Sequence, residues 1–390
     1  MQIFTLPSWY KSKKYPEASI FIYEQMKALT ETGDKVVVLA VEPISFKSIE
    51  KPHRDIIFED DNGVLTYRTE IRALYPSKLR AQYIYVFRKA LRRLLDIAIK
   101  DHGKPDVLYA HFSYPAGAIA VDFAKEYNIP LVVEEHYSGL MENHIDKALL
   151  KCVEKAVSGS NTFIAVSAGL KQSIEKKFGR QTDIMVASNM INNAFKYIEP
   201  NEHEKFVFFA CGSLIPRKGF SELIRAFTNE FKQENEVVLR IGGSGEQEEK
   251  LRELITSLKM SPRIELIGQL SREKTIQEYS GCDCFVLPSK AETYGLVYRE
   301  ALAIGRPIIS TMHGGFGESD WHDEYGKLIP VDDENALRTA MRQVYQNYKD
   351  YDLRRISRLC LQDCSSSSVA GKIHTILLAA SKGISEMQEL

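Results

Sequence analysis

The chain has 390 residues, of which 44% are hydrophobic and 26% charged, and its formal net charge is −1. This length predicts two soluble domains, and the balanced charge argues against nucleic acid as the main partner. The sequence contains no run of about 18 apolar residues, the length needed to span a membrane. The first residues also lack the apolar core of a signal peptide. We therefore expect a cytoplasmic protein whose six cysteines are buried thiols.

Short apolar runs rich in β-branched residues alternate with segments of helical period. This alternation predicts parallel sheets with helices on both faces, the doubly wound α/β arrangement. The strands expected in the first half are Gln2–Leu6, Val36–Val41, Val64–Arg68, Val107–Ala110, Leu131–Glu134, Phe163–Val166 and Ile184–Ala187. Those expected in the second half are Phe206–Cys211, Val237–Ile241, Ile264–Ile267, Cys284–Leu287, Pro307–Ser310 and Lys327–Ile329. The clearest helices are Ile20–Thr32, Gly219–Phe231, Glu246–Leu258, Arg272–Tyr279 and Leu296–Ile304.

The strand series restarts near Phe206, after the polar stretch Tyr197–Lys205. This restart predicts two domains, residues 1–195 and 196–368. In open α/β sheets, ligands bind beyond the carboxyl ends of the strands. Functional motifs should therefore come directly after strands.

The most informative segment runs from Pro288 to Pro307. Glu292 lies in the loop before a predicted helix, Glu300 lies within that helix, and Gly295 stands between them. A loop that opens onto a helix N-terminus offers unpaired N–H groups and suits an anion, and glycine allows a close approach to it. The alternative is that both glutamates are simply solvated.

This segment resembles the E-x7-E signature of retaining glycosyltransferases of family 4, whose fold is called GT-B. The resemblance implies two doubly wound Rossmann-like domains that face a cleft. The second domain would bind the nucleotide sugar, and a last helix, at about 369–390, would cross back onto the acceptor-side first domain. The matching positions are Pro288, Ser289, Glu292, Gly295, Glu300, Ala301, Gly305 and Pro307.

Further motifs follow other strands of the second half, in the order that the family requires. Arg217 and Lys218 match an R/K-K-G element that neutralises the leaving diphosphate, although alone they would be an ordinary basic turn. By the same resemblance, Glu300 would hold the ribose and Glu292 the donor sugar. A G-G-x-x-E element matches Gly314, Gly315 and Glu318. The donor contacts implied are Gly212, Arg217, Lys218, Gly243, Ser244, Leu270, Glu292, Tyr294, Gly295, Leu296 and Glu300.

In the first half, His136 follows a predicted strand end. A lone histidine is more often structural, but this one matches the family's catalytic-region histidine near the C6 hydroxyl of the donor sugar. The resemblance thus implies four catalytic residues: His136, Glu292, Arg217 and Lys218.

A basic helix is expected before Lys104, because the stretch from Arg72 contains nine Lys or Arg against two acids. Four of its cations fall together on one helical face, which could contact anionic phospholipid or the acceptor, each contributing about 1 kcal/mol. The alternative is a solvated helix face. These four residues are Arg88, Lys89, Arg92 and Arg93.

The resemblance implies a retaining transferase that moves a hexose from a UDP- or GDP-type sugar to a hydroxyl of a glycan or lipid-linked glycan. Such an enzyme would serve cell-surface polysaccharide or glycoconjugate synthesis, and the basic helix would allow it to bind as a peripheral protein on the inner face of the membrane. No cofactor or metal is expected, because Arg217 and Lys218 would neutralise the diphosphate and Asp60-Asp61 is interpreted as a polar turn. The alternatives are a nucleotide-sugar epimerase or phosphorylase-like enzyme of the same fold, or a sugar-binding protein without catalysis.

Overall fold

The computed structural model describes residues 1–16, 19–45, 52–53, 55–73, 80–142, 145–178, 184–201, 203–313, 315–316 and 321–383. The chain forms two compact units. The first comprises Met1–Met190 together with the segment from Ser366 onward, and the second comprises Ile191–Ser365. The chain thus passes from the first unit to the second after Met190 and returns at Ser366, whereas the boundaries expected from the sequence are residues 195 and 369.

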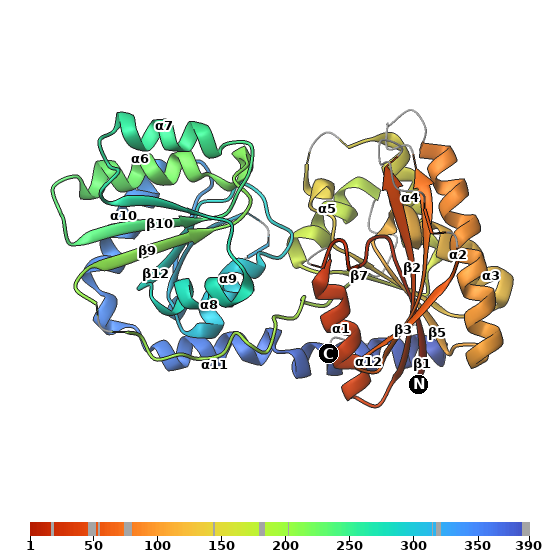
Figure 1. The fold of residues 1–390 in the computed structure, drawn as a ribbon. Helices are drawn as coiled ribbons and strands as arrows, with labels where there is room; N and C mark the ends of the chain where they lie inside the picture. Colours follow the sequence, from red (N-terminus) through yellow and green to blue (C-terminus); the bar gives the residue numbers. More distant parts are fainter. Residues whose placement is uncertain are drawn as a thin grey trace. The chain divides into compact units, whose positions relative to one another are not determined.

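The first unit is built on one eight-stranded sheet with the order β3-β4-β2-β1-β5-β6-β7-β8. Helices α1 and α12 pack on one face, and α2 and α3 pack on the other (Figure 1). The strands are β1 Gln2–Pro7, β2 Lys35–Ser45, β3 Ile57–Asp61, β4 Val64–Ala73, β5 Val107–His111, β6 Leu131–Glu135, β7 Thr162–Ala165 and β8 Ile184–Val186. The α-helices are α1 Ile20–Glu31, α2 Arg80–His102, α3 Ala118–Tyr127, α4 Lys147–Gly159, α5 Ala168–Phe178 and α12 Ser366–Ser381.

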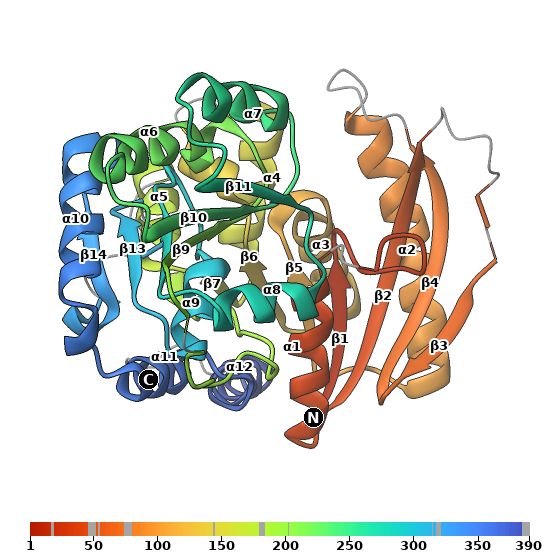
Figure 2. The ribbon, with the colours of Figure 1, turned by 60° about the vertical axis from the view of Figure 1, so that its left-hand side comes forward.

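One strand of this sheet was not expected. β3 runs antiparallel to β4, with Asp61 paired to Val64, and Figure 2 shows the two strands at the outer edge of the sheet. The interpretation of Asp60-Asp61 as a polar turn is therefore wrong, because both residues belong to β3. The turn lies one residue later, at Asn62 and Gly63, which both have positive φ angles.

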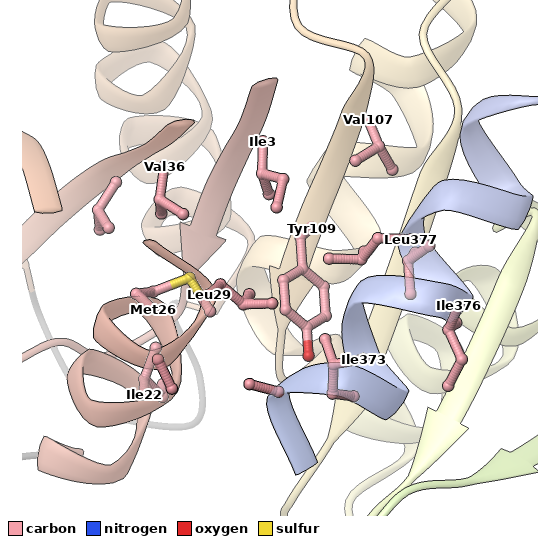
Figure 3. Close-up of a cluster of buried hydrophobic side chains, with 14 of the residues drawn as sticks. Ile3, Ile22, Met26, Leu29, Val36, Val107, Tyr109, Ile373, Ile376 and Leu377 are labelled. Atoms are coloured by element: carbon pink, nitrogen blue, oxygen red, sulfur yellow. The ribbon is translucent and has the colours of Figure 1, made fainter. Parts of the chain in front are cut away.

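Helix α12 completes the core of the first unit. Its buried residues include Val369, Ile373, Ile376 and Leu377, which recur at helical spacing and so form one apolar stripe. Figure 3 shows this stripe beside side chains of α1, β1 and β5. Each fully buried side chain of this size contributes about 1.5–3 kcal/mol, so α12 is an integral part of the unit.

The second unit contains a six-stranded parallel sheet with the order β11-β10-β9-β12-β13-β14. Helices α6, α7 and α10 cover one face, and α8, α9 and α11 cover the other (Figure 1). Its strands are β9 Phe206–Cys211, β10 Val237–Gly242, β11 Ile264–Gly268, β12 Cys284–Leu287, β13 Ile308–Thr311 and β14 Gly326–Ile329. Its α-helices are α6 Phe220–Phe231, α7 Glu248–Ser257, α8 Arg272–Ser280, α9 Leu296–Ile304, α10 Glu334–Gln346 and α11 Leu353–Cys364. Two doubly wound α/β units are thus confirmed.

The sequence predicts that four cations on one face of α2 can contact phospholipid or the acceptor, but two of them are engaged within the first unit. Arg88 forms an ion pair with Asp122 of α3, and Arg92 binds both carboxylate oxygens of Glu126 on the same helix. Lys89 is exposed and belongs to no such pair with α3. Half of the basic cluster therefore serves to attach α2 to α3, which the sequence could not reveal because the acids belong to a different helix.

Candidate functional site

The predicted donor residues gather at the carboxyl edge of the second unit's sheet. β9 lies between β10 and β12, so the order of the strands reverses at β9. In open α/β sheets, such a reversal is where ligands bind. Most of the predicted residues lie in the loops that follow β9, β10 and β12.

The loops after β9 and β10 approach each other at two glycines. Gly212 and Gly243 both have positive φ angles, and a Cβ on Gly243 would lie 1.9 Å from the carbonyl oxygen of Gly212. Only glycine permits this approach. The Leu214 N–H donates to the Ser244 carbonyl at 2.9 Å, and the Leu270 side chain covers Gly242. The backbones of the two loops are therefore in direct contact.

Lys218 and Glu292 form an ion pair at the centre of this edge. Their side chains are 12% and 10% exposed, so the pair is largely shielded from solvent. The Ser289 hydroxyl donates to the same carboxylate oxygen of Glu292 at 3.0 Å. A charge-assisted contact in such a site is stronger than one in water. Residues 74 positions apart in sequence are thus brought into direct contact.

Arg217 lies between the loops after β9 and β12. Its Nη1 donates to the Ala291 carbonyl at 3.2 Å, and its own carbonyl accepts from the Lys290 N–H at 2.7 Å. Gly219 fits tightly here, because a Cβ at that position would lie 2.3 Å from the Pro288 carbonyl oxygen. These contacts fix the basic turn against the Glu292 loop.

Gly295 begins helix α9 with a φ angle of 74°, in the left-handed region that favours glycine. Leu296 is the first residue of the helix, and Tyr294 is buried before it. The Arg299 guanidinium lies 3.8 Å from the centre of the Tyr294 ring and donates to the Tyr294 carbonyl at 2.7 Å. The N-terminus of α9 is therefore held rigidly, with the positive end of its dipole beside the Lys218–Glu292 pair.

Glu300 lies about one turn further along α9 than Leu296. Its carboxylate accepts a hydrogen bond of 3.3 Å from the buried Tyr279 hydroxyl, which also reaches the Val297 carbonyl at 2.8 Å. Tyr279 was not identified from the sequence, because a tyrosine in the last turn of a helix looks like an ordinary core residue.

His313, after β13, is a second residue that the sequence analysis did not assign. It is 5% exposed, its Nδ1 accepts from the Gly315 N–H at 3.1 Å, and burial lowers its pKa to about 4. A Cβ on Gly315 would lie 2.8 Å from the Glu292 carbonyl oxygen. This neutral histidine therefore shapes the loop that packs against Glu292. The other two members of the predicted G-G-x-x-E element, Gly314 and Glu318, lie outside the described residues.

His136 belongs to the first unit, directly after β6. Its Nε2 lies 3.1 Å from Nδ1 of His111, and its buried Nδ1 has no hydrogen-bond partner among the residues that the structure describes. Burial lowers the pKa of His136 to about 3, so its imidazole is neutral at physiological pH. Such a ring can exchange hydrogen bonds with a hydroxyl, but it carries no positive charge with which to attract an anion.

His111, Glu134 and His136 place one ligand atom each within 4.8 Å of one another, as a metal site would require. The 3.1 Å hydrogen bond between the two rings explains their approach without an ion. Glu134 also accepts hydrogen bonds from Tyr109 and, at 3.1 Å, from Gln25, and burial raises its pKa to about 7. A hydrogen-bonded network of these side chains accounts for the contacts.

Comparisons with known proteins agree with this architecture. Residues 192–357 match the family model described as glycosyl transferases group 1, and residues 18–195 match the model described as glycosyltransferase family 4. The chain is 24% identical over 377 residues to glycogen synthase of Mycobacterium tuberculosis, with 93% of this chain and 91% of the relative covered.

Solved structures show the same fold at low identity. Sucrose-phosphate synthase from Thermosynechococcus elongatus aligns with a TM-score of 0.77 at 18% identity, over 97% of this chain and all of that one. HepE of Anabaena, solved in complex with UDP and glucose, aligns with a TM-score of 0.70 at 18% identity and the same coverage. The two family matches together span nearly the whole chain, and this protein belongs to the family 4 glycosyltransferases of GT-B fold.

Proposed function

We propose that this protein is a retaining hexosyltransferase that uses a nucleotide diphosphate sugar, of UDP or GDP type, as donor. The acceptor is a hydroxyl of a glycan or of a lipid-linked glycan, in the synthesis of a cell-surface polysaccharide or glycoconjugate. The solved relative that binds UDP and glucose supports a nucleotide sugar as donor.

The observation that carries this proposal is the contact between Lys218 and Glu292. The family resemblance assigns the first residue to the diphosphate and the second to the sugar, and in the structure both side chains reach the same small volume. A ligand in which an anionic diphosphate is joined directly to a hydroxylated sugar satisfies both groups at once. Arg217 and the N-terminus of α9 at Gly295 lie beside this volume.

In the mechanism that we propose, the diphosphate leaves toward positive groups that are already in place. Lys218 exchanges Glu292 for the diphosphate, and the dipole of α9 adds to its stabilisation. The acceptor hydroxyl attacks the anomeric carbon from the side that the diphosphate leaves, and its proton passes to the departing phosphate oxygen. Catalysis is then mainly electrostatic stabilisation of the leaving group.

A thermal-shift screen over UDP-, GDP- and ADP-sugars tests the donor class. A true donor present at a hundredfold excess over its Kd should stabilise the protein by about 2.7 kcal/mol. Hydrolysis of the same donor without acceptor then separates an enzyme from a binding protein, and NMR of the product anomer tests retention. Interconversion of nucleotide sugars without transfer would instead indicate an epimerase.

Glu300→Ala should raise the donor KM about tenfold while kcat changes little. Glu300 would hold the ribose equally in the ground and transition states, so removing its carboxylate weakens both states alike. The loss of one hydrogen bond to a charged group corresponds to about a tenfold change in affinity. Steady-state kinetics with varied donor measure both constants. A fall in kcat at unchanged KM would contradict the assignment of Glu300 to the ribose.

Transfer should proceed in EDTA at close to its normal rate. Lys218 and Arg217 supply the positive charge that a metal ion provides in other transferases, so the diphosphate needs no bridging cation. The measurement is the initial rate before and after chelation. Loss of activity that Mn²⁺ or Mg²⁺ restores would show that these side chains are insufficient.

We propose a peripheral membrane association through α2, which should be weak and reversible. No helix among the described residues is long and apolar enough to cross a bilayer. Lys89 and Arg93 are exposed on α2, and we propose that their side chains make this contact. Co-sedimentation with phosphatidylglycerol vesicles should occur at low salt and disappear at high salt.

The matched variant changes Lys89 and Arg93 to Ser and leaves the two ion pairs with α3 intact. It should abolish sedimentation without altering donor hydrolysis. Equal sedimentation with neutral and anionic vesicles would contradict an electrostatic contact.

A further inference from the structure

Tyr279, in the last turn of α8, is fully buried in the second unit. Three phenylalanine rings pack against its ring, with centroid distances of 5.3 Å for Phe209, 5.5 Å for Phe285 and 6.1 Å for Phe195. Its main-chain carbonyl accepts a hydrogen bond of 3.1 Å from Nε of the buried Arg306. Because both the ring and the backbone are held, close packing fixes the position of the phenolic oxygen.

The hydroxyl of Tyr279 belongs to a short polar chain that joins β9 to α9. The sulfur of Cys211, the last residue of β9, lies 3.4 Å from the phenolic oxygen. On the other side, this oxygen lies 2.8 Å from the Val297 carbonyl and 3.3 Å from a carboxylate oxygen of Glu300. A carbonyl and a carboxylate can only accept, so the phenol donates toward α9 and the Cys211 thiol donates to the phenol.

Both hydroxyl and thiol keep their protons in this chain. Burial, followed by the nearby Cys211 thiol and Glu300 carboxylate, holds the pKa of the Tyr279 phenol well above its usual range. Burial also raises the pKa of the Cys211 thiol to about 12. The direction of donation, from β9 toward the carboxylate on α9, is therefore the same throughout the physiological pH range.

The carboxylate of Glu300 is well placed to use a fixed donor. Glu300 is only half-buried, so a ligand at the surface can reach it. A glutamate side chain has several rotatable bonds, and ordering it when a ligand binds costs conformational entropy. A donor that already holds the carboxylate lowers this cost. The remaining lone pairs of its two oxygens can still accept hydroxyl groups of a ligand.

We propose that Tyr279 is a positioning residue whose hydroxyl holds the Glu300 carboxylate in the orientation that accepts the ribose hydroxyls of the donor nucleotide. This inference rests on the proposed function and deepens it, because it assigns part of the affinity for the ribose to a residue outside the segment from Pro288 to Pro307. Glu300 would hold the ribose equally in the ground and transition states, so Tyr279 acts on donor binding and not on the chemical step.

Tyr279→Phe tests this role, because it removes the hydroxyl and keeps the ring. Binding is measured by titration calorimetry of the full chain with UDP and with GDP, each compared with its 2′,3′-dideoxy form. The wild type should prefer the ribonucleotide by about tenfold, since the dideoxy form offers Glu300 no hydroxyl. In Tyr279→Phe, this preference should fall to about threefold, through weaker binding of the ribonucleotide alone.

Steady-state kinetics provide a second measurement of the same effect. The donor KM of Tyr279→Phe should rise about threefold, the factor expected for ribonucleotide binding, while kcat stays unchanged. A fall in kcat at unchanged KM would contradict a role in positioning Glu300.

A double-mutant cycle separates positioning from a general structural role. When Glu300 is already changed to Ala, Tyr279→Phe should weaken ribonucleotide binding no further. Tyr298→Phe is the matched control, because Tyr298 is also fully buried and donates at 2.7 Å to a backbone carbonyl, that of Leu287. Both tyrosine variants should lower the Tm slightly, but only Tyr279→Phe should reduce the preference for the ribonucleotide.

The outcomes separate this inference from the proposed function. An unchanged preference in Tyr279→Phe, equal weakening of both nucleotide forms, or the same effect with and without Glu300 would overturn the positioning role and leave the donor class intact. Equal binding of the ribonucleotide and the dideoxy form by the wild type would overturn both this role and the assignment of Glu300 to the ribose. If neither UDP nor GDP binds, the proposed donor class fails, and this inference fails with it.

Discussion

A Lys218→Ala variant should lose about two to three orders of magnitude in kcat/KM. The ammonium group is held in a site where its side chain is 12% exposed, so its charge acts on the departing diphosphate with little screening by water. Removing one such donor from a preorganised site typically costs about 2.7–4 kcal/mol of transition-state stabilisation. Kinetics with the donor identified by thermal shift provide the measurement.

The control for this variant must address folding, because Lys218→Ala also leaves the carboxylate of Glu292 without its cation. Thermal unfolding should therefore be recorded alongside activity, and Lys218→Met combined with Glu292→Gln should restore stability without restoring turnover. Lys274→Ala, on the exposed side of α8, is the matched lysine control. Near-normal turnover by Lys218→Ala would refute the assignment to the diphosphate.

Glu292→Ala should reduce kcat by about two orders of magnitude without raising the donor KM. Its proposed partner is the reacting sugar, whose charge changes in the transition state, so the loss falls on turnover. Its removal also frees Lys218 from its internal partner. Diphosphate binding in the ground state should then be as tight as before or tighter.

A lower kcat at unchanged KM is the opposite of the result expected for Glu300→Ala. The two variants together therefore test the roles of both glutamates. Glu249→Ala, exposed on α7, serves as the control for loss of a glutamate elsewhere in the unit. A Glu292→Ala enzyme that binds the donor much more weakly but turns over normally would show that the two roles are reversed.

The parallel strands were predictable because both of their faces are buried. Such strands appear in the sequence as continuous apolar runs, as in Phe206–Cys211 and Cys284–Leu287. β3 was missed because an edge strand needs no such run: Ile57 and Phe58 are exposed and three acidic residues follow. The Asn62-Gly63 pair, a strong hairpin signal, could have revealed it.

The candidate site was predictable as motifs but not as contacts. The motifs placed Arg217, Lys218 and Glu292 after their strands, yet the direct pairing of Lys218 with Glu292 depends on how closely the loops approach. The same limit explains α2, where the sequence shows four cations but not that Asp122 and Glu126 neutralise two of them. Pairing between distant segments is a tertiary property that local spacing does not encode.

The return of α12 to the first unit has a consequence for biosynthesis. Residues 191–365 must be translated before this helix exists, which at about 5–20 residues per second takes on the order of ten to thirty seconds. During this interval, the apolar groove formed by α1, β1 and β5, which Ile373, Ile376 and Leu377 later fill, remains uncovered on the ribosome. The nascent N-terminal half is therefore a natural client for chaperones, and its folding is completed only when the end of the chain emerges.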